Sequence, residues 1–351
     1  MTANVSRPGA SRRSILGGAA ALSAGALLPG FSAAQAKKIG SADYGVASID
    51  PSYAMAYVAL KKNYFGESGL DVKYLNAQSG PRAKQMLAAG QILMATTGVN
   101  DSVALRIAGK PSVLVAAFDN RVAFANIMIS KKLYDQGVRD VKQLAGRSIG
   151  VTQPQAATWL MATYIADRAG LKDKVQIKPL GDFATMMGAV KSGAIDCVTA
   201  TYGMLEKGQE EGWGVPLFDI TNDNNWNALF GGPVNGYGCY VLQETIDKRP
   251  EAVQALVTGL VKATNFIRTA SATEIANTIH ADYLQGFSMP SVVSAINVYK
   301  KTWSTDNRIT QDSYNRLVSI MENRQFTTAE LKAAPYAEAV NMTFVNNARK
   351  A

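Results

Sequence analysis

The sequence predicts an α/β protein built as two open lobes, with a helical C-terminal part. Short apolar strands alternate with helices from Lys37 to about Asn222. Some of these strands, such as residues 112–118, are apolar on both faces, which is typical of a parallel sheet covered by helices on both sides. The chain has 351 residues, more than a single hydrophobic core usually serves, so two domains are expected.

Residues 1–36 are set aside because they have the pattern of an export signal. Arg12 and Arg13 precede a weakly apolar stretch that ends in the cleavage-like sequence Ala34-Gln35-Ala36. The arginine pair is typical of a twin-arginine signal, which exports an already folded protein across a bacterial inner membrane. The apolar run is too short and too broken by glycines to span a membrane. We therefore expect a periplasmic protein that is soluble after signal removal.

The first lobe begins after this segment. Pro51 follows Asp50 as a proline at the first helical position follows its cap, and Leu70, Val72 and Tyr74 alternate as in a half-buried strand. Gly90 can take the left-handed conformation that ends a helix. The predicted strands cover residues 37–44, 69–75, 92–97 and 112–118, and the predicted helices cover residues 51–63, 81–90 and 102–109.

The alternation then begins again. An extended stretch at 120–130 leads to predicted strands at 147–151, 175–180 and 195–200 and helices at 158–169, 183–191 and 204–211. An internal echo supports this division, because "AAGQILMATTG" and "KSGAIDCVTATYG" share a helix end, a glycine, a strand and a small hydroxylated turn. Residues 221–238 are predicted to be a loop, residues 239–246 a strand, and the chain beyond Pro250 mostly helical.

Charge and composition exclude several functions. The formal net charge is +9, but lysines and arginines are scattered, so no stripe for nucleic acid is present. A weakly positive surface could attract a small anion. Cys197 and Cys239 lie in apolar contexts where a buried free thiol is the common outcome, although export would permit a disulfide.

Catalytic patterns are absent. The single histidine, His280, lies in the helical tail, and the sequence has no metal-ligand spacing, nucleophile elbow or phosphate loop. "GGPVNGYG" does not lie between a strand and a helix, so it is interpreted as a connection and not as a nucleotide loop. We predict no catalytic residue, no metal and no cofactor.

Binding is better supported, because the loops that follow the strands are small and polar and would expose helix amides to an anion or a carbonyl-like group. Arg82 and Arg121 could neutralise an anionic headgroup, and Tyr44, Tyr53, Trp159 and Tyr237 could form an apolar wall. The other candidate ligand contacts are Ser79, Gly80, Thr97, Gly98 and Asn100 in the first lobe and Gln155, Thr158, Asp182, Thr201 and Tyr202 in the second.

A family resemblance rests on the order and spacing of several soft motifs. "ALKKNYFGESGLDVKYLNAQSG", "QMLAAGQILMATTG", "KQLAGRSIGV" and "GAVKSGAIDCVTATYG" resemble the solute-binding proteins of bacterial ABC importers for nitrate, sulfonates, taurine and thiamine precursors, of the NMT1/THI5-like and SsuA/TauA types. The resemblance covers Lys37 to about Asp219. One departure is Leu93, where the family commonly has an aspartate that Asp196 retains in the second lobe.

The resemblance implies a bilobal periplasmic-binding-protein fold of type II. One lobe would comprise residues 37–125 and 230–351, the other residues 126–229, with two crossover segments as the hinge. It further implies a monomer that captures a small organic, anionic solute between the lobes and delivers it to a permease in the inner membrane. Two alternatives stay open: an enzyme like the pyrimidine synthases of thiamine biosynthesis, and a ligand-sensing periplasmic receptor.

Overall fold

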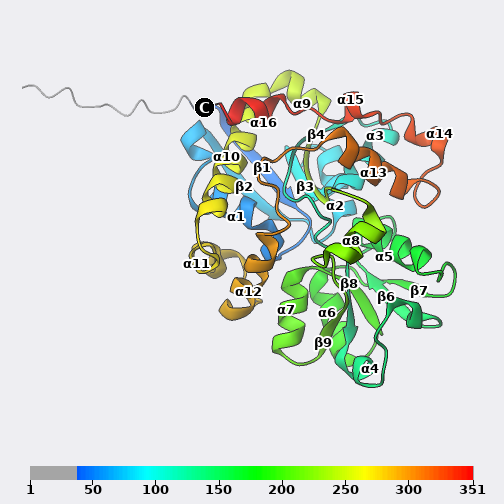
Figure 1. Ribbon diagram of the computed structural model, residues 1–351. Helices are drawn as coiled ribbons and strands as arrows, with labels where there is room; N and C mark the ends of the chain where they lie inside the picture. Colours follow the sequence, from blue (N-terminus) through cyan, green and yellow to red (C-terminus); the bar gives the residue numbers. More distant parts are fainter. Residues whose placement is uncertain (1–37, 351) are drawn as a thin grey trace, which may run out of the picture. The chain divides into compact units, whose positions relative to one another are not determined.

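The computed structural model describes residues 38–350 and contains two five-stranded sheets, each with helices on its faces (Figure 1). The predicted export segment lies outside the described residues. The first sheet has the order β2 (Leu70–Asn76), β1 (Gly40–Val46), β3 (Met94–Gly98), β10 (Tyr237–Leu242) and β4 (Ser112–Ala117). The second has the order β7 (Gln176–Pro179), β6 (Ser148–Val151), β8 (Cys197–Ala200), β5 (Asn126–Ser130) and β9 (Gly214–Phe218).

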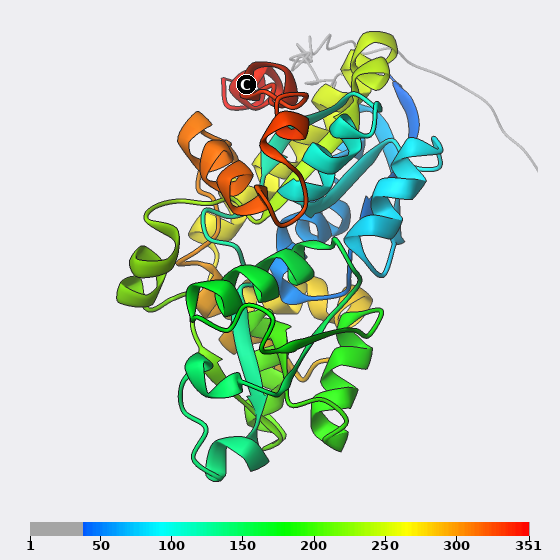
Figure 2. The same ribbon diagram turned by 90° about the vertical axis from the view of Figure 1, so that its right-hand side faces the viewer.

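The helices alternate with these strands, as the sequence predicts. Those of the first sheet are η1 (Pro51–Tyr53), α1 (Ala54–Lys61), η2 (Gly66–Ser68), α2 (Gly80–Ala88) and α3 (Val99–Ile107). Those of the second are α4 (Lys131–Asp135), η3 (Val141–Leu144), α5 (Ala157–Arg168), α6 (Phe183–Ser192) and α7 (Tyr202–Glu210), drawn in green in Figure 2. The α/β class is confirmed.

The sheets are mixed and not purely parallel. β1 pairs in parallel with β2 and β3, and β6 pairs in parallel with β7 and β8. In the first sheet β10 runs antiparallel to β3 and β4, and in the second β5 runs antiparallel to β8 and β9. Each antiparallel strand is the one that follows a crossing of the chain from the other sheet. The two strands that carry the internal echo, β3 and β8, occupy the same central place in their sheets.

Two crossings join the sheets, one between β4 and β5 and one between β9 and β10. Asp119 holds them together. Its Oδ1 accepts hydrogen bonds from the backbone N–H groups of Gly236 and Tyr237 at 2.6 and 3.1 Å, and its Oδ2 accepts one from Ala123 N–H at 3.3 Å. The side-chain amide of Asn235 donates to the Asp119 carbonyl. The two crossings are therefore one hydrogen-bonded unit.

Two local predictions are wrong, and one strand was not predicted. The loop predicted over 221–238 contains α8 (Asp223–Phe230), which starts because the Asn222 side chain caps two backbone N–H groups and which is held by buried Trp226 and Phe230. The strand predicted over 239–246 ends at Leu242, where α9 (Gln243–Lys248) begins. Strand β9 was not predicted, because it contains Gly214 and Pro216, which are unfavourable inside a strand away from an edge.

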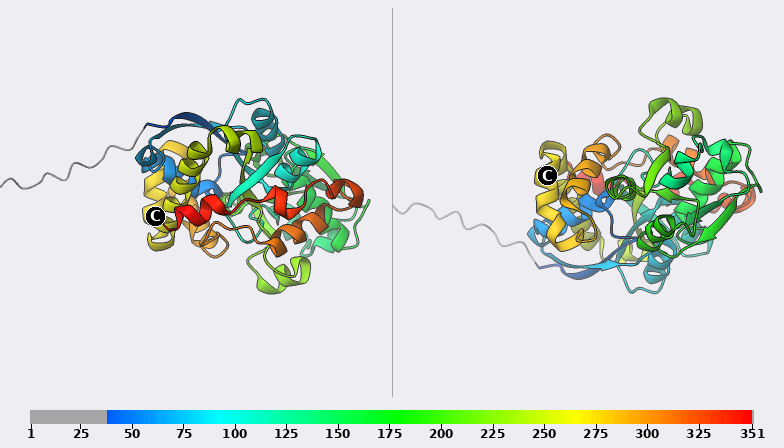
Figure 3. Two further views of the ribbon diagram at one scale, coloured as in Figure 1. Left: turned by 90° about the horizontal axis from the view of Figure 1, so that it is seen from above. Right: turned by 90° about the horizontal axis from the view of Figure 1, so that it is seen from below.

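The C-terminal part is helical, as predicted. It packs against helices that cover the first sheet and against helices that cover the second. It contains α10 (Pro250–Thr269), α11 (Ala272–Tyr283), α12 (Met289–Tyr299), α13 (Gln311–Met321), α14 (Thr328–Leu331), α15 (Tyr336–Ala339) and α16 (Thr343–Ala348). α10 packs between α1 and α16, so the red C-terminal helix lies beside it (Figure 3). α12 contacts η1 and α7, and α13 contacts α3 and α5. These two helices therefore touch elements of both lobes.

Among the described residues no helix is both long enough and apolar enough to cross a membrane. Cys197 and Cys239 are buried and free.

Candidate ligand-binding site

A small cavity lies where the carboxyl ends of strands from both sheets meet. Its volume is about 20 Å³, roughly the space of one water molecule. The first sheet and its following loops contribute Ala47, Ser48, Tyr53, Ser79, Gly80, Gly98, Asp101, Phe124 and Tyr237, and the second contributes Thr152, Ala156, Ala157, Thr158 and Phe183. An organic solute would need more room, so the lobes must separate further to admit one.

Three helices begin at this cavity. Ser79 caps α2, its Oγ accepting from Arg82 N–H at 3.4 Å, whereas α3 and α5 begin at Gly98 and Ala156 without a side-chain cap. The first N–H groups of a helix lack partners within it, so a helix end without a side-chain cap can offer backbone donors and a positive partial charge. At α3 the Val99 N–H already donates to the Gly236 carbonyl at 2.9 Å and Asp101 lies in the first turn, so this end is partly occupied by the protein itself. At α5, Thr158 Oγ1 is engaged with Thr152, 2.8 Å between the two hydroxyl oxygens.

Asp101 is the charged residue that lines the cavity, and its side chain is fully buried. Its Oδ2 accepts a hydrogen bond from Thr97 Oγ1 at 2.8 Å, while Oδ1 has no hydrogen-bond partner among the described residues. Burial raises the pKa of this carboxyl, and Lys84, the Thr97 hydroxyl and the Gly98 backbone N–H offset the rise only in part. A Cβ at Gly80 would come within 2.2 Å of Oδ2, so the carboxylate fills the notch that this glycine leaves at the start of α2.

Aromatic rings form one wall of the cavity. Tyr53 and Tyr237 lie 4.7 Å apart between ring centroids, and Phe124 meets Tyr237 edge-on at 5.1 Å. The Tyr53 hydroxyl is buried without a hydrogen-bond partner of standard geometry among the described residues. Phe183, at the start of α6, contributes from the second lobe. Such a wall suits a flat or apolar organic body.

A buried carboxylate fastens the two lobes beside the cavity. Asp50 accepts hydrogen bonds from Thr201 Oγ1, at the start of α7, at 2.6 Å and from Tyr299 Oη at 2.9 Å. The same Tyr299 hydroxyl accepts from the backbone N–H groups of Tyr202 and Gly203. A Cβ at Gly203 would lie 2.4 Å from Asp50 Oδ2, so this close approach requires glycine. The amino end of α7 is thus occupied by the chain's own carboxylate and phenol.

The predicted contacts are distributed over several places. Ser79, Gly80, Gly98 and Thr158 line the cavity, and Thr97 supports Asp101 from behind. Asn100 and Gln155 meet across the lobes, the Asn100 side-chain amide donating to the Gln155 carbonyl at 3.4 Å. The others serve structure: Thr201 binds Asp50, the Tyr202 hydroxyl donates to Asp219, and Asp182 caps α6 through Thr185 N–H.

Neither predicted arginine lines the cavity. Arg82 is exposed and donates to the Gln78 side chain. Arg121 donates to the Ile220 carbonyl at 2.9 Å, pairs with Asp223 and lies over the Trp226 ring. Both guanidinium groups therefore have partners of their own outside the cavity.

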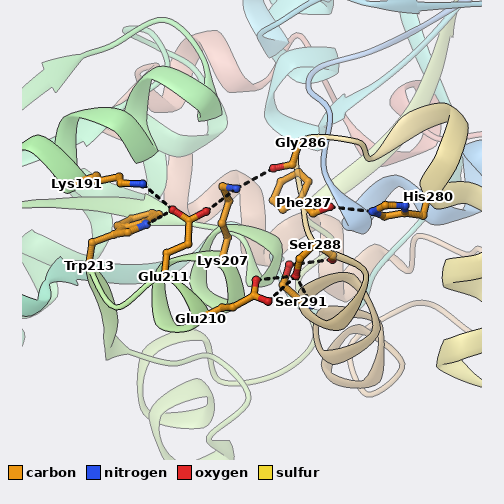
Figure 4. A network of polar contacts seen from close by, with 10 residues as sticks. All are labelled: Lys191, Lys207, Glu210, Glu211, Trp213, His280, Gly286, Phe287, Ser288 and Ser291. Carbon is orange, nitrogen blue, oxygen red and sulfur yellow. Dashed lines mark hydrogen bonds and ion pairs between the residues drawn. The ribbon is translucent and has the colours of Figure 1, made fainter.

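A larger groove of about 580 Å³ lies between α6, α7 and the turn before α12. Glu211 accepts there from Lys191 and Lys207, each at 2.8 Å, and from the Trp213 ring N–H at 2.9 Å (Figure 4). Lys207 also donates to the Gly286 carbonyl, so the network ties α7 to the C-terminal part. His280 Nε2 lies 2.8 Å from the Phe287 carbonyl. The charged groups of this groove are therefore paired with one another and are not left for a ligand. The network connects α7 to the C-terminal part and so forms a second contact between the lobes.

Among the described residues no group of three or more His, Cys, Asp or Glu side chains is arranged to hold a metal ion. The cavity itself offers one carboxylate, from Asp101, and hydroxyl groups.

Sequence reasoning did not select Asp101, Ser48, Thr152, Phe124 or Phe183 as site residues. Asp101 carried a usable signal, because it follows the carboxyl end of β3 and lies in the first turn of the next helix. Ser48 and Thr152 carried the same signal, because they follow the carboxyl ends of β1 and β6. Phe124 and Phe183 carried no comparable signal.

The model of a family described as NMT1/THI5 like matches residues 50–271, more than half of the chain. The chain belongs to the NMT1/THI5-like family. The resemblance stated from the sequence is thereby confirmed. A comparison with curated protein sequences finds no match.

Solved structures share the fold of this NMT1/THI5-like protein. One from Bordetella bronchiseptica RB50 matches with 24% identity and a TM-score of 0.79, over 88% of this chain and 97% of the other. The alkanesulfonate-binding protein SsuA from Xanthomonas axonopodis pv. citri, bound to MOPS, has 14% identity and a TM-score of 0.68, over 88% and 100%. The nitrate-binding protein NrtA from Synechocystis PCC 6803 has 12% identity and a TM-score of 0.70, over 88% of each chain. The bilobal periplasmic-binding-protein fold is confirmed.

Proposed function

We propose that this NMT1/THI5-like protein is the substrate-binding component of an ABC importer. It captures a small organic solute between its lobes, without altering it, and hands the solute to a permease in the inner membrane. The observation that carries the proposal is the cavity itself: strand ends and helix N-termini of both lobes converge there on a buried, unpartnered polar group.

The hinge and the lobe contacts support this role. The two crossings are joined at Asp119, so they can flex as one unit, and separable hydrogen bonds connect the lobes at Asp50 and Asn100. A solute that binds both lobes would favour the closed arrangement, and a permease could recognise that difference. Export to the periplasm as a monomer stays a prediction from the sequence.

The charge of the solute has arguments on both sides. The basic net charge and the uncapped helix ends favour the anion that the sequence predicts. The positions of Arg82 and Arg121 outside the cavity and the acid at Asp101 argue for a different group.

The enzyme alternative is weaker. A pyrimidine synthase of the related kind would need a reactive lysine and histidine in the cleft, and the lining residues in the described part of the chain include neither. His280 instead bonds the Phe287 carbonyl. A ligand-sensing receptor would use the same lobes, and neighbouring genes for a permease and an ATPase would distinguish the importer.

Replacing Ala157 with leucine tests the site. Ala157 lines the cavity opposite Gly98, whose added Cβ would lie 2.5 Å from the Ala157 Cβ, so a larger side chain acts as a wedge between the lobes. Overpacking costs about 1–3 kcal/mol, so we expect solute affinity to fall roughly ten- to hundredfold. Native mass spectrometry of protein purified from its own periplasm identifies the retained solute, and calorimetry with that solute measures the loss.

Ala89→Leu, at the exposed end of α2, is the matched control and should bind as the wild type does. Wild-type protein that retains no small molecule and gains no thermal stability from a broad solute panel would contradict the proposed function.

A further inference from the structure

We propose that the solute presents a hydrogen-bond-donating nitrogen group, neutral or cationic, to Asp101, and that it is not a carboxylate or a sulfonate. This inference rests on the proposed function and specifies its substrate class.

Asp101 has an acceptor oxygen that the protein leaves unused. The side chain is fully buried and lines the cavity. Thr97 satisfies Oδ2, which leaves Oδ1 as an acceptor without a donor among the described residues. A buried polar atom without a partner is costly, so when the lobes close a solute that donates to Oδ1 is favoured over one that leaves this oxygen without a donor. The Tyr53 hydroxyl is a second buried polar atom that has no hydrogen-bond partner of standard geometry among the described residues.

The electrostatics of the cavity also bear on the solute. Lysine and arginine are absent from the cavity lining formed by the described residues, and Lys84 on α2 is the cation that acts on Asp101 from nearby. The Asp101 carboxylate fills the notch at Gly80, which is where an anion would approach the amino end of α2. A carboxylate or sulfonate solute would therefore face a buried acid at close range and would lack a guanidinium group to pair with.

The aromatic wall bears on the solute as well. The rings of Tyr53, Tyr237 and Phe124 contact one another beside Asp101, with centroid separations of 4.7 and 5.1 Å. Ring faces attract cations and stack on planar groups. An amidine, an aminoheterocycle or an aromatic amide would satisfy the acid and the rings together.

The test uses four probes that share a benzene ring and differ in their head group. These are benzamidine (cation), benzamide (neutral donor), benzoate and benzenesulfonate (anions). Thermal shift and isothermal calorimetry are measured on the whole mature protein, on Asp101→Asn and on Asp71→Asn, which changes an exposed carboxyl on β2. Asparagine keeps an acceptor for Thr97, so Asp101→Asn is expected to fold, and its melting curve without probe checks this.

We expect benzamidine to bind most tightly, benzamide next, and the two anions at least tenfold more weakly than benzamidine. Asp101→Asn should lower the affinity for benzamidine at least tenfold and reduce the ratio of the benzamidine affinity to the benzoate affinity. Asp71→Asn should leave the affinities for all four probes unchanged. An anion that binds as well as benzamidine, an unchanged benzamidine affinity in Asp101→Asn, or no binding by either donor probe would each overturn the inference. If anions bind and Ala157→Leu abolishes their binding, the proposed function stands and only this inference falls.

Discussion

Replacing Asp50 with alanine is expected to open the protein. Asp50 is fully buried and receives hydrogen bonds from the Ser52 N–H, the Thr201 hydroxyl and the Tyr299 hydroxyl, at 2.6 to 2.9 Å. Each buried donor left without an acceptor costs about 1–3 kcal/mol. Separation of the lobes lets water reach the donors of Thr201 and Tyr299, so the closed arrangement loses about 2–6 kcal/mol relative to the open one.

Distances between fluorophores or spin labels on the two lobes would measure this shift. Cysteines introduced at exposed Lys73 and Lys142 label selectively, because both native cysteines are buried. Tyr299→Phe removes one hydroxyl of the same cluster and should open the protein to a smaller extent, and Asp71→Ala should leave the distances unchanged. Identical distance distributions for wild type and Asp50→Ala would show that this cluster does not hold the lobes.

Replacing Asp119 with alanine is expected to cause the largest loss of stability. Its carboxylate accepts hydrogen bonds from the backbone N–H groups of Ala123 and Gly236 in the two crossings and of Tyr237 at the start of β10. Unlike the donors at Asp50, these groups are buried inside the hinge and gain no water when the lobes separate. We expect the free energy of unfolding to fall by about 3–5 kcal/mol in a urea titration. A loss below 1 kcal/mol would contradict this assignment.

The pH dependence gives a second readout for Asp119. Burial raises the pKa of its carboxyl from the ordinary 3.8 to about 8, although its backbone hydrogen bonds lower it in part. Between these values the unfolded chain has released a proton that the folded protein still holds, so this group's contribution to stability is complete below pH 3.8 and is lost as the pH rises to about 8.

The variant Asp119→Asn has no carboxyl group that can titrate at this position, so comparing it with the wild type tests the raised pKa directly. The stability advantage of the wild type over Asp119→Asn should therefore shrink from pH 4 to pH 8, whereas other titrating groups cancel in the comparison. Parallel stability curves for the two proteins across that range would contradict the raised pKa.

Local patterns predicted most of the secondary structure. Alternation at Leu70, Val72 and Tyr74 marked β2, and the Asp50-Pro51 pair marked the start of a helix, where the Asp50 side chain accepts the Ser52 N–H. These signals succeed because the atoms concerned lie within a few residues of one another. They fail at α8, whose Asn-rich start resembles a loop until buried Trp226 and Phe230 fix it as a helix.

For the candidate site, too, the sequence located some residues correctly and misplaced others. The turn at Ser79 and Gly80 was selected from its place after a strand, and it lies at the cavity. Arg121 was selected for its charge, but Asp223, the Ile220 carbonyl and the Trp226 ring engage it. No sequence pattern could give those partners, since Ile220 lies 99 positions further along the chain and Asp223 and Trp226 follow it in α8.

By itself the sequence determined most strands and helices of two α/β lobes, the polar turns that follow the strands and the family, because each depends on short-range spacing. Only the tertiary structure decided which polar groups remain available to a solute. Asp50 accepts a hydrogen bond from Thr201, 151 positions away in the sequence, and is not available to a solute. Asp101 is buried with one oxygen that has no partner among the described residues. Burial and long-range pairing set that difference, and both arise only when the lobes pack together.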